Sequence, residues 1–281
     1  MLIAGGEPTF EYIRRLVHQR SAVVLEARQA YLAETRLMPL AEEYGFRSVT
    51  ELVNRLRSEP FGGLHRRVVE AMTTNETCFF RDPNCFESLR KDVLPALVRA
   101  RAAQRRLRVW SAACSTGQEP YSVAMLLREF APDLTAWNLE LIASDLATEV
   151  LRRAQSATYS QLEVNRGLPA ALLLRYFTKQ GLEWRLNEDV RAMVEFRETN
   201  LIEPWPATLH GLDVVLLRNV LIYFDVETKR AILAQVRRVL RPDGYLILGS
   251  AETTLMLDDA FERSSADSAG CYRLRSDGGA A

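Results

Sequence analysis

The sequence has little that would point to metal chemistry or to disulfide bonds. It contains four cysteines and three histidines in 281 residues, and no two cysteines form a close C-x-x-C pair. The histidines are isolated and lack the spacing of metal ligands. We therefore expect no metal site and no disulfide framework, as in a protein of the reducing cytosol. The residues concerned are Cys78, Cys85, Cys114 and Cys271, with His18, His65 and His210.

A charge imbalance and a long apolar run are also absent. The 36 Lys and Arg residues balance 36 Asp and Glu residues, so no net field draws the protein towards nucleic acid or an anionic membrane. No stretch of about 18 apolar residues occurs, and residues 1–10 contain no basic region followed by an apolar run. We expect a cytoplasmic protein without membrane insertion and without a nucleic acid partner.

The first part of the chain has a helical pattern. Between Phe10 and Val69, apolar residues recur at three- and four-residue spacings, and breaks at Pro39, Gly45 and residues 60–63 divide the pattern into three or four short helices. We assign residues 1–72 to an N-terminal helical domain. Ten Arg against eight Glu over residues 10–70 favour a solvated helix surface over a binding face.

Strands and helices alternate in the rest of the chain, residues 73–275. This order predicts a parallel, doubly wound α/β sheet with its ligand at the carboxyl ends of the strands. Between Thr178 and Phe196 apolar and polar residues alternate, so we expect a small antiparallel β insertion at about 176–198. The polar tail 276–281 is expected to be disordered. Predicted strands are Leu107–Ser111, Leu139–Ala143, Met193–Arg197, Leu212–Leu217 and Gly244–Leu248, and predicted helices are Asn84–Gln104, Pro120–Phe130, Thr148–Gln155 and Val226–Leu240.

The loop after the first predicted strand is built from small residues. It runs from Ser111 to Gly117 and enters a helix with Pro120 near its first turn, which lets the backbone approach a bound nucleoside closely. Gly117 is its only glycine, so the Gly-x-Gly-x-x-Gly pattern of a dinucleotide site is missing. An ordinary tight turn between strand and helix is the alternative.

Asp145 ends the second predicted strand, where an acidic residue can accept hydrogen bonds from ribose hydroxyls. Its alternative role is to cap the helix that begins near Thr148. Together with the small-residue loop, Asp145 favours a nucleoside cofactor.

A further apolar strand, Leu212–Leu217, ends abruptly in Arg218 and Asn219. In an α/β sheet this position holds ligand-binding groups. The aromatic pair Tyr223 and Phe224 follows, and taken alone these two residues could be core aromatics.

These segments together resemble the chemotaxis-receptor glutamate methyltransferase family, the CheR type, from about Phe10 to Leu274. The resemblance implies an N-terminal helical domain joined to a Rossmann-like class I methyltransferase sheet that carries a small antiparallel β insertion. It also implies S-adenosylmethionine as cofactor and a methyl-accepting chemotaxis-type receptor as protein substrate, and we expect a monomer. The motifs that carry it are residues 74–82 (TNETCFFRD), 110–122 (WSAACSTGQEPYS), 143–145 (ASD) with 148–151 (TEVL), and 217–225 (LRNVLIYFD).

The resemblance also implies the site residues. Arg81 and Tyr223 would lie nearest the methyl transfer, and Arg81 would contact the cofactor as well. Cofactor-binding residues carried over from the family are Asn75, Thr77, Arg81, Glu119, Asp145, Asn200, Leu201, Arg218 and Asn219.

Two departures from the family bear on which receptor is recognised. The chain has a less basic second helix, residues 27–40, and a short turn at Thr178–Leu182 in the insertion. We therefore expect Arg14, Arg15, Arg28 and Arg36 to be candidate contacts to acidic receptor helices.

Two other functions compete with this reading. A class I methyltransferase for a small molecule or nucleic acid would use the arginine-rich run at residues 99–108, although cations there suit the carboxyl end of a helix. A non-catalytic regulator that binds the nucleoside would be expected to lose Arg81 or Tyr223, and both are present.

Overall fold

The computed structural model describes residues 8–130, 136–264 and 270–275. The tail 276–281 lies outside the described residues. The chain divides into two compact units, Met1–Thr74 with Tyr223–Asp225, and Asn75–Ile222 with Val226–Ala281.

The described part of the first unit is helical, with apolar side chains from every helix in its core. Ile13, Val17, Leu37 and Leu52 are almost completely buried. The side chain of Ser48 caps α3 by accepting a hydrogen bond from the Glu51 N–H at 3.2 Å. The helices are α1 (Thr9–Ser21), α2 (Ala30–Glu43), α3 (Val49–Ser58) and α4 (Gly63–Met72), with a short 3₁₀ turn, η1, at Ala27–Gln29.

The helix break predicted at Pro39 is wrong, because Pro39 lies inside α2. Proline removes one helical hydrogen bond but leaves the others intact. Leu37, Leu40 and Ala41 around it are buried, and this packing outweighs the lost bond.

The second unit is built on a seven-stranded sheet with the order β6-β2-β1-β7-β8-β10-β9. Strands β6, β2, β1, β7 and β8 pair in parallel, whereas β10 runs antiparallel to β8 and β9. Central strand β7 is buried along its whole length, which fits a sequence that is apolar at every position except Asp213. The strands are β1 (Arg106–Ala112), β2 (Asn138–Asp145), β6 (Val194–Glu198), β7 (Leu212–Leu217), β8 (Leu240–Leu248), β9 (Phe261–Arg263) and β10 (Cys271–Leu274).

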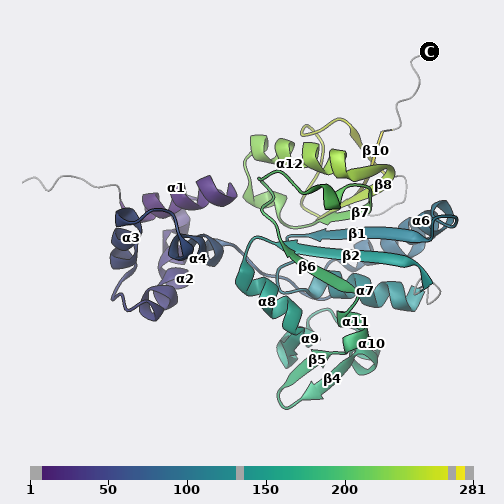
Figure 1. Cartoon of the computed structure of the whole chain (residues 1–281), viewed down its shortest axis with the longest axis horizontal. Coiled ribbons are helices and arrows are strands. Elements are labelled where there is room, and N and C mark those ends of the chain that lie inside the picture. The colour runs from purple at the N-terminus through teal and green to yellow at the C-terminus, as the bar shows by residue number, and fades with distance from the viewer. Residues whose placement is uncertain (1–7, 131–135, 265–269, 276–281) are drawn as a thin grey trace, which may run out of the picture. The chain divides into compact units, whose positions relative to one another are not determined.

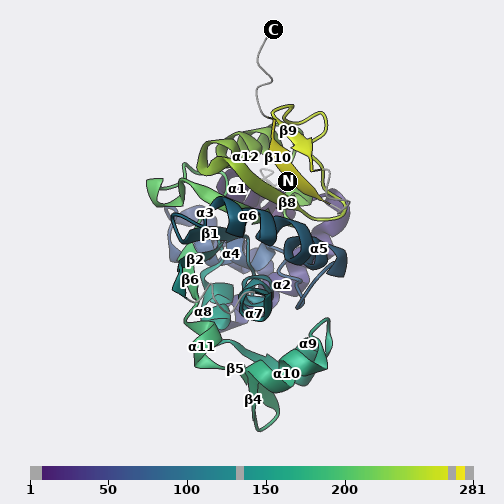
Figure 2. The same cartoon turned by 90° about the vertical axis from the view of Figure 1, so that its right-hand side faces the viewer.

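Helices cover both faces of this sheet, as expected for a doubly wound fold. Figure 1 shows α12 on one face and α7 on the opposite face, and Figure 2 shows the same arrangement from the side. The helix predicted over Asn84–Gln104 is divided by a π-helical segment, η2 (Leu89–Val93), into α5 and α6. The helices are α5 (Pro83–Ser88), α6 (Leu94–Ala100), α7 (Gln118–Phe130), α8 (Thr148–Ser156), α9 (Gln161–Asn165), α10 (Ala170–Tyr176), α11 (Glu188–Arg191) and α12 (Val226–Val239), with 3₁₀ turns η4 (Ala207–Leu209) and η5 (Leu221–Tyr223).

A separate antiparallel sheet of three strands has the order β3-β5-β4 and lies beyond α7, on the side away from α12 (Figures 1 and 2). Its strands are β3 (Thr158–Ser160), β4 (Phe177–Gln180) and β5 (Glu183–Leu186). The range predicted for the insertion, 176–198, differs from this sheet at both ends. The segment predicted at Met193–Arg197 forms β6, which pairs with β2 in the main sheet because its apolar residues meet that sheet edge. Strand β3, missed by the sequence analysis, is too short to give an alternating pattern.

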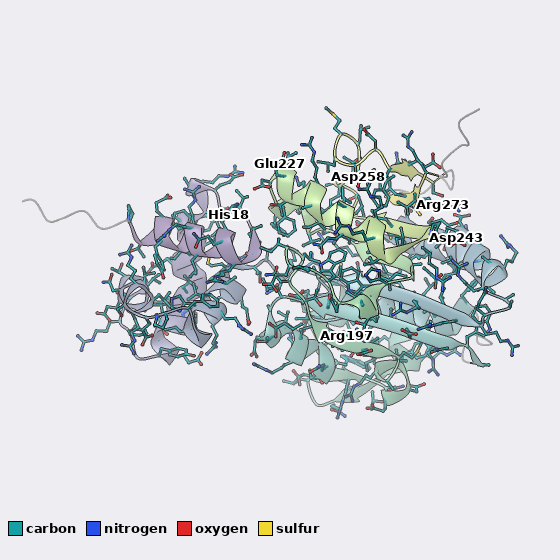
Figure 3. The ribbon with its side chains drawn as sticks, turned by 45° about the horizontal axis from the view of Figure 1, so that its top comes forward. His18, Arg197, Glu227, Asp243, Asp258 and Arg273 are labelled. Atoms are coloured by element: carbon teal, nitrogen blue, oxygen red, sulfur yellow. The ribbon has the colours of Figure 1, made fainter. Side chains whose placement is uncertain are left out.

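Buried ion pairs hold the amino ends of the main strands together. The Arg101 side chain donates to Asp213 at 2.6 Å and to Asp243 at 2.8 Å, and Asp213 is fully buried. Asp213 also accepts the backbone N–H of Arg108. Figure 3 shows Asp243 at the end of the unit where α6 lies. Arg106 and Arg108 pair with Glu140, so three arginines of the run at 99–108 form ion pairs within the protein, although the Arg106 side chain is exposed.

Candidate functional site

The residues predicted to bind a ligand surround the point where the strand order of the main sheet reverses. From β1 the chain proceeds to β2 on one side, whereas from β7 it proceeds to β8 on the other side, and β1 and β7 are neighbours. In open α/β sheets a crevice forms at the carboxyl ends of such strands, because the following loops diverge. The loops after β1 and β7 contain the Ser111–Gly117 sequence and Arg218–Asn219.

The loop after β1 has an unusual backbone. Ala113, Ser115 and Gly117 all have positive φ angles, of 55°, 51° and 92°. Two of the three are not glycine, and backbone in this region is strained for ordinary residues and concentrates at functional sites. A Cβ on Gly117 would lie 3.0 Å from the Ala154 side chain, so glycine is required there for packing as well. The sequence indicated the small residues but not the left-handed backbone.

Asp145 connects this loop to the end of β2. Its carboxylate accepts the N–H of Ser115 at 2.8 Å and that of Ala147 at 3.0 Å, and the residue is 7% exposed. Asp145 is not the N-cap residue of α8, which is Ala147, although its carboxylate accepts the Ala147 N–H directly before that helix. Each carboxylate oxygen has a second lone pair, so Asp145 can hold the loop and still accept hydroxyl groups.

Asn200 and Leu201 lie in the turn after β6, beside Asp145. The N–H of Thr199 donates to the Asp145 carbonyl at 3.0 Å, which ties this turn to the end of β2. The Asn200 side chain accepts the Ile202 N–H and donates to Glu203. Leu201 is buried. The structure thus brings Asp145, Asn200 and Leu201 to one region.

The segment from Asn75 to Asp82 is anchored along the other side of the loop. The Ser115 hydroxyl donates to the Asn75 carbonyl at 2.8 Å, and the Phe80 N–H donates to the Ser122 hydroxyl at 3.0 Å. Arg81 and Thr77 are half-buried, and the Arg81 guanidinium donates to the Glu76 carbonyl at 3.1 Å. Asn75, Thr77 and Arg81 therefore lie on a segment that is bound to the small-residue loop and to α7.

Arg218 is the charged centre of the site. Its side chain is 1% exposed and donates to Glu119 at 2.9 Å, to Asp82 at 2.8 Å and to the Arg81 carbonyl at 2.7 Å. Burial opposes the charge on Arg218, but the neighbouring groups, Glu119 foremost, outweigh it and raise the pKa of Arg218, so the guanidinium stays charged. Ser111 donates to the second Glu119 oxygen at 2.8 Å. The roles of Ser111 and Asp82 have no signal in the sequence, because they arise from the packing of segments that lie far apart in the chain.

The site fits a nucleoside with a charged tail. The strained small-residue loop leaves room for the backbone to approach a ligand, and Asp145 retains acceptor capacity beside it. The Arg218 Nε is buried and has no hydrogen-bond partner in the described protein, so a donor stays available within the charged cluster. In the described residues no group of three or more His, Cys, Asp or Glu side chains could hold a metal ion.

Tyr223 belongs by its contacts to the first unit, where its carbonyl accepts the Val24 N–H at 2.9 Å. Tyr223 is half-buried, and Phe224 is buried, as the core-aromatic alternative expects for Phe224. Asn219, four residues earlier, belongs to the second unit. The participation of Tyr223 in methyl transfer therefore stays a prediction.

The proposed receptor contacts of the first unit differ in their surroundings. Arg14 donates to the Leu25 carbonyl and pairs with Glu11, and Arg36 donates to the carbonyls of Met72 and Thr73. Both therefore have structural roles within the unit. The Arg28 side chain is 82% exposed, although it pairs with Glu26.

The chain has a doubly wound sheet, its predicted ligand-binding residues lie at the reversal of strand order, and it lacks the dinucleotide glycine pattern. This arrangement is typical of α/β enzymes that bind a nucleoside cofactor. The chain matches the family described as CheR methyltransferase, SAM binding domain, over residues 75–269, and CheR methyltransferase, all-alpha domain, over residues 8–73. The boundary between these matches falls where the two structural units meet in the sequence, at Thr74 and Asn75.

Curated relatives match over nearly the whole chain. Chemotaxis protein methyltransferase 1 of Pseudomonas aeruginosa is 41% identical over 278 residues, which cover 97% of this chain and 100% of the relative. Chemotaxis protein methyltransferase Cher2 of Pseudomonas putida is 40% identical over 264 residues, with 92% and 95% covered. A solved TehB-like SAM-dependent methyltransferase of Corynebacterium glutamicum has 10% identity and a TM-score of 0.40, with 80% of this chain and 99% of that chain covered.

The chain belongs to the CheR methyltransferase family. It is a methyltransferase, and its cofactor is S-adenosylmethionine. The fold class and the cofactor predicted from the sequence are confirmed. Among the described residues, no helix combines the length and the apolar character needed to cross a bilayer.

Proposed function

We propose that this methyltransferase modifies glutamate side chains of a chemotaxis-type receptor, giving glutamate methyl esters and S-adenosylhomocysteine. The observation that carries the proposal is the assembly of Arg81, Glu119 and Arg218 into one hydrogen-bonded cluster at the reversal of strand order. The Asn75 carbonyl, on the segment that carries Arg81, accepts a hydrogen bond from Ser115 of the small-residue loop. The names of the relatives, which refer to chemotaxis, support a receptor as the substrate.

The cofactor is proposed to lie across the ends of β1, β2 and β7. Asp145 accepts ribose hydroxyls, with Asn200 and Leu201 beside it on the nucleoside side. The charged end of the cofactor lies towards Arg218, Asn219 and Glu119. Asn75, Thr77 and Arg81 close the site from the 75–82 segment. This division follows the charges, because Arg218 forms ion pairs with Glu119 and Asp82, whereas Asp145 beside Asn200 offers a carboxylate that can accept hydroxyl groups.

The reaction requires alignment more than activation. A glutamate side chain has a reference pKa of about 4.3, so at neutral pH its carboxylate is already a nucleophile and needs no general base. When bound, S-adenosylmethionine supplies the electrophilic methyl group, and the carboxylate oxygen takes the methyl while the bonding electron pair stays on sulfur. Arg81 holds the incoming carboxylate and Tyr223 orients it by a hydrogen bond. The ion pairs of Arg218 fix the segment that carries Arg81.

We infer a cytoplasmic monomer that meets its receptor at the membrane surface and has no nucleic acid partner. The engagement of Arg101, Arg106 and Arg108 in ion pairs supports the last point, because an arginine that neutralises a carboxylate contributes less to phosphate binding. Arg28 and Arg15 are the better candidates for contacts with acidic receptor helices, since Arg14 and Arg36 already hold the helical unit together.

The experiment is to incubate the protein with S-adenosylmethionine and membranes that contain a candidate receptor, and then to map the receptor peptides by mass spectrometry. The proposal expects a mass increase of one methylene on glutamate residues of the receptor. Modification of lysine, of nucleic acid or of a small molecule in place of glutamate would replace the proposed substrate with another one.

A further inference from the structure

Glu252, in the loop after β8, has a carboxylate that is surrounded by backbone N–H groups. Its Oε2 accepts the N–H of Asn219 at 2.7 Å and that of Gly249 at 2.8 Å. Its Oε1 accepts the N–H of Val220 at 2.9 Å and that of Ile222 at 3.3 Å. The residue is 8% exposed. One buried side chain therefore receives four backbone hydrogen bonds.

Three of these four donors belong to the segment that follows β7 and contains Asn219. Beyond the end of a strand, backbone N–H groups no longer have partners in the sheet, and leaving them buried without an acceptor is costly. Successive N–H groups that converge in this way form a concave site for an anion. In this protein the anion is a side chain of the next loop, so the loops after β7 and β8 are joined through Glu252.

Gly249 gives a second, independent observation. A Cβ on Gly249 would lie 2.7 Å from the Asn219 Nδ2 and 2.8 Å from the Glu252 Oε2. The absence of a side chain thus lets the Asn219 amide pack directly over the loop after β8. Asn219 itself has a φ of 58°, which asparagine tolerates better than most residues. Both its backbone and its side chain are fixed from the same loop.

We propose that Glu252 is a positioning residue for methyl transfer, which holds Arg218 and Asn219 in the orientation that binds the cofactor. This inference rests on the proposed function, because it takes Arg218 and Asn219 as cofactor-binding residues. Glu252 acts through the backbone of the 218–222 segment and not by contact with reacting groups. Its role requires an acceptor at both oxygens, since Oε1 and Oε2 each receive two N–H groups.

Glu252→Gln tests this requirement with almost no change of shape. The amide has one acceptor oxygen, and its NH₂ group would face two N–H donors. We expect the affinity for S-adenosylhomocysteine, measured by calorimetry, to fall at least tenfold, and the KM for S-adenosylmethionine to rise by a similar factor. The KM for receptor should change little.

Glu252→Asp keeps both acceptor oxygens on a shorter side chain, so it should restore part of the affinity. Glu262→Gln, at an exposed glutamate of β9, is the matched control for loss of charge and should bind like the wild type.

Gly249→Ala provides a second variant if Glu252→Gln does not fold. The new methyl group would push the Asn219 amide and the Glu252 carboxylate while leaving both residues present, so cofactor affinity should fall here as well. A folded Glu252→Gln protein with wild-type affinity and wild-type KM would overturn the inference, and so would wild-type affinity of Gly249→Ala. A variant whose activity falls only in proportion to its folded fraction, with equal effects on every kinetic constant, also overturns it. Failure of the wild-type protein to bind the product would instead contradict the proposed function.

Discussion

The Arg218 guanidinium donates a hydrogen bond to Glu119 at 2.9 Å, and this contact joins the loop after β7 to the first turn of α7, 99 residues apart in the sequence. The Arg218 side chain is 1% exposed and that of Glu119 is 13% exposed, so water screens the pair poorly. Asp82 adds a second carboxylate from the segment that carries Arg81. The arrangement of the site therefore depends on the buried positive charge of Arg218, which the carboxylates of Glu119 and Asp82 neutralise.

Replacement of Glu119 by alanine should destabilise the protein, because it leaves the buried Arg218 with the more exposed Asp82 as the one carboxylate among its described partners. We expect the free energy of unfolding in urea to fall by about 3 kcal/mol. The double variant Glu119→Ala with Arg218→Met should be more stable than the sum of the two single changes predicts. Glu149→Ala, at an exposed ion pair, should have little effect. Additive single changes at Glu119 and Arg218 would mean that the two residues are not coupled.

Asp145→Asn should weaken the binding of S-adenosylhomocysteine at least about tenfold, because hydrogen bonds to a charged acceptor are worth about 1.5–3 kcal/mol. Calorimetry measures the affinity, and thermal unfolding checks that the loss of the Ser115 and Ala147 contacts has not unfolded the site. Glu195→Gln, at an exposed glutamate of β6, is the control. If a folded Asp145→Asn protein binds S-adenosylhomocysteine as tightly as the wild type, Asp145 does not contact the ribose.

Tyr223→Phe should lower turnover at least about tenfold at saturating cofactor, while the affinity for S-adenosylmethionine stays close to that of the wild type. The reason is that the hydroxyl is proposed to act on the reacting carboxylate and not on cofactor binding. Tyr31→Phe removes the hydroxyl of a tyrosine in α2 that is 67% exposed, and it should leave turnover unchanged. Equal turnover of Tyr223→Phe and wild type would exclude Tyr223 from the mechanism.

The fold was predictable from the sequence where apolar patterns are long. Strand Leu212–Leu217 was predicted with its observed bounds, because a central parallel strand is buried on both faces and five of its six residues are apolar. Strand β3 has three residues, too few for a pattern, and β6 was assigned both to the main sheet and to the insertion because an edge strand alternates like an exposed one. Pro39 shows that packing can override a local signal.

The site was predictable only in part. Family-like motifs pointed to Arg218, Glu119 and Arg81, and the structure brings these residues into one cluster. The left-handed backbone at Ala113 and Ser115 has no sequence signal, since alanine and serine rarely adopt it and only the surrounding structure imposes it. Glu252 was missed because its partners are backbone N–H groups, which any sequence provides.

The stability of the second unit should depend on pH through Asp243. Its hydrogen bond to Arg101 lowers the pKa of the Asp243 carboxyl below its usual value of 3.8. The pKa of Asp243 is lower in the folded than in the unfolded protein. The stabilisation from its ion pair with Arg101 is therefore fully present above the unfolded pKa and is lost as the pH falls through the folded pKa. Urea unfolding of wild type and Asp243→Asn between about pH 2 and pH 7 should therefore give a difference in stability that is constant near neutrality and vanishes in acid. If the stability difference between wild type and Asp243→Asn is the same at every pH, the ion pair of Asp243 with Arg101 does not make stability depend on pH.

The most direct measurement is transfer of radiolabelled methyl from S-adenosylmethionine to receptor in membranes, followed by treatment of the labelled receptor with base. The account predicts label on the receptor that base releases as methanol, because carboxylate methyl esters hydrolyse under those conditions. It also predicts that a receptor with its acceptor glutamates changed to alanine takes up no label. Label that resists base, or label on a receptor without those glutamates, would contradict glutamate methylation.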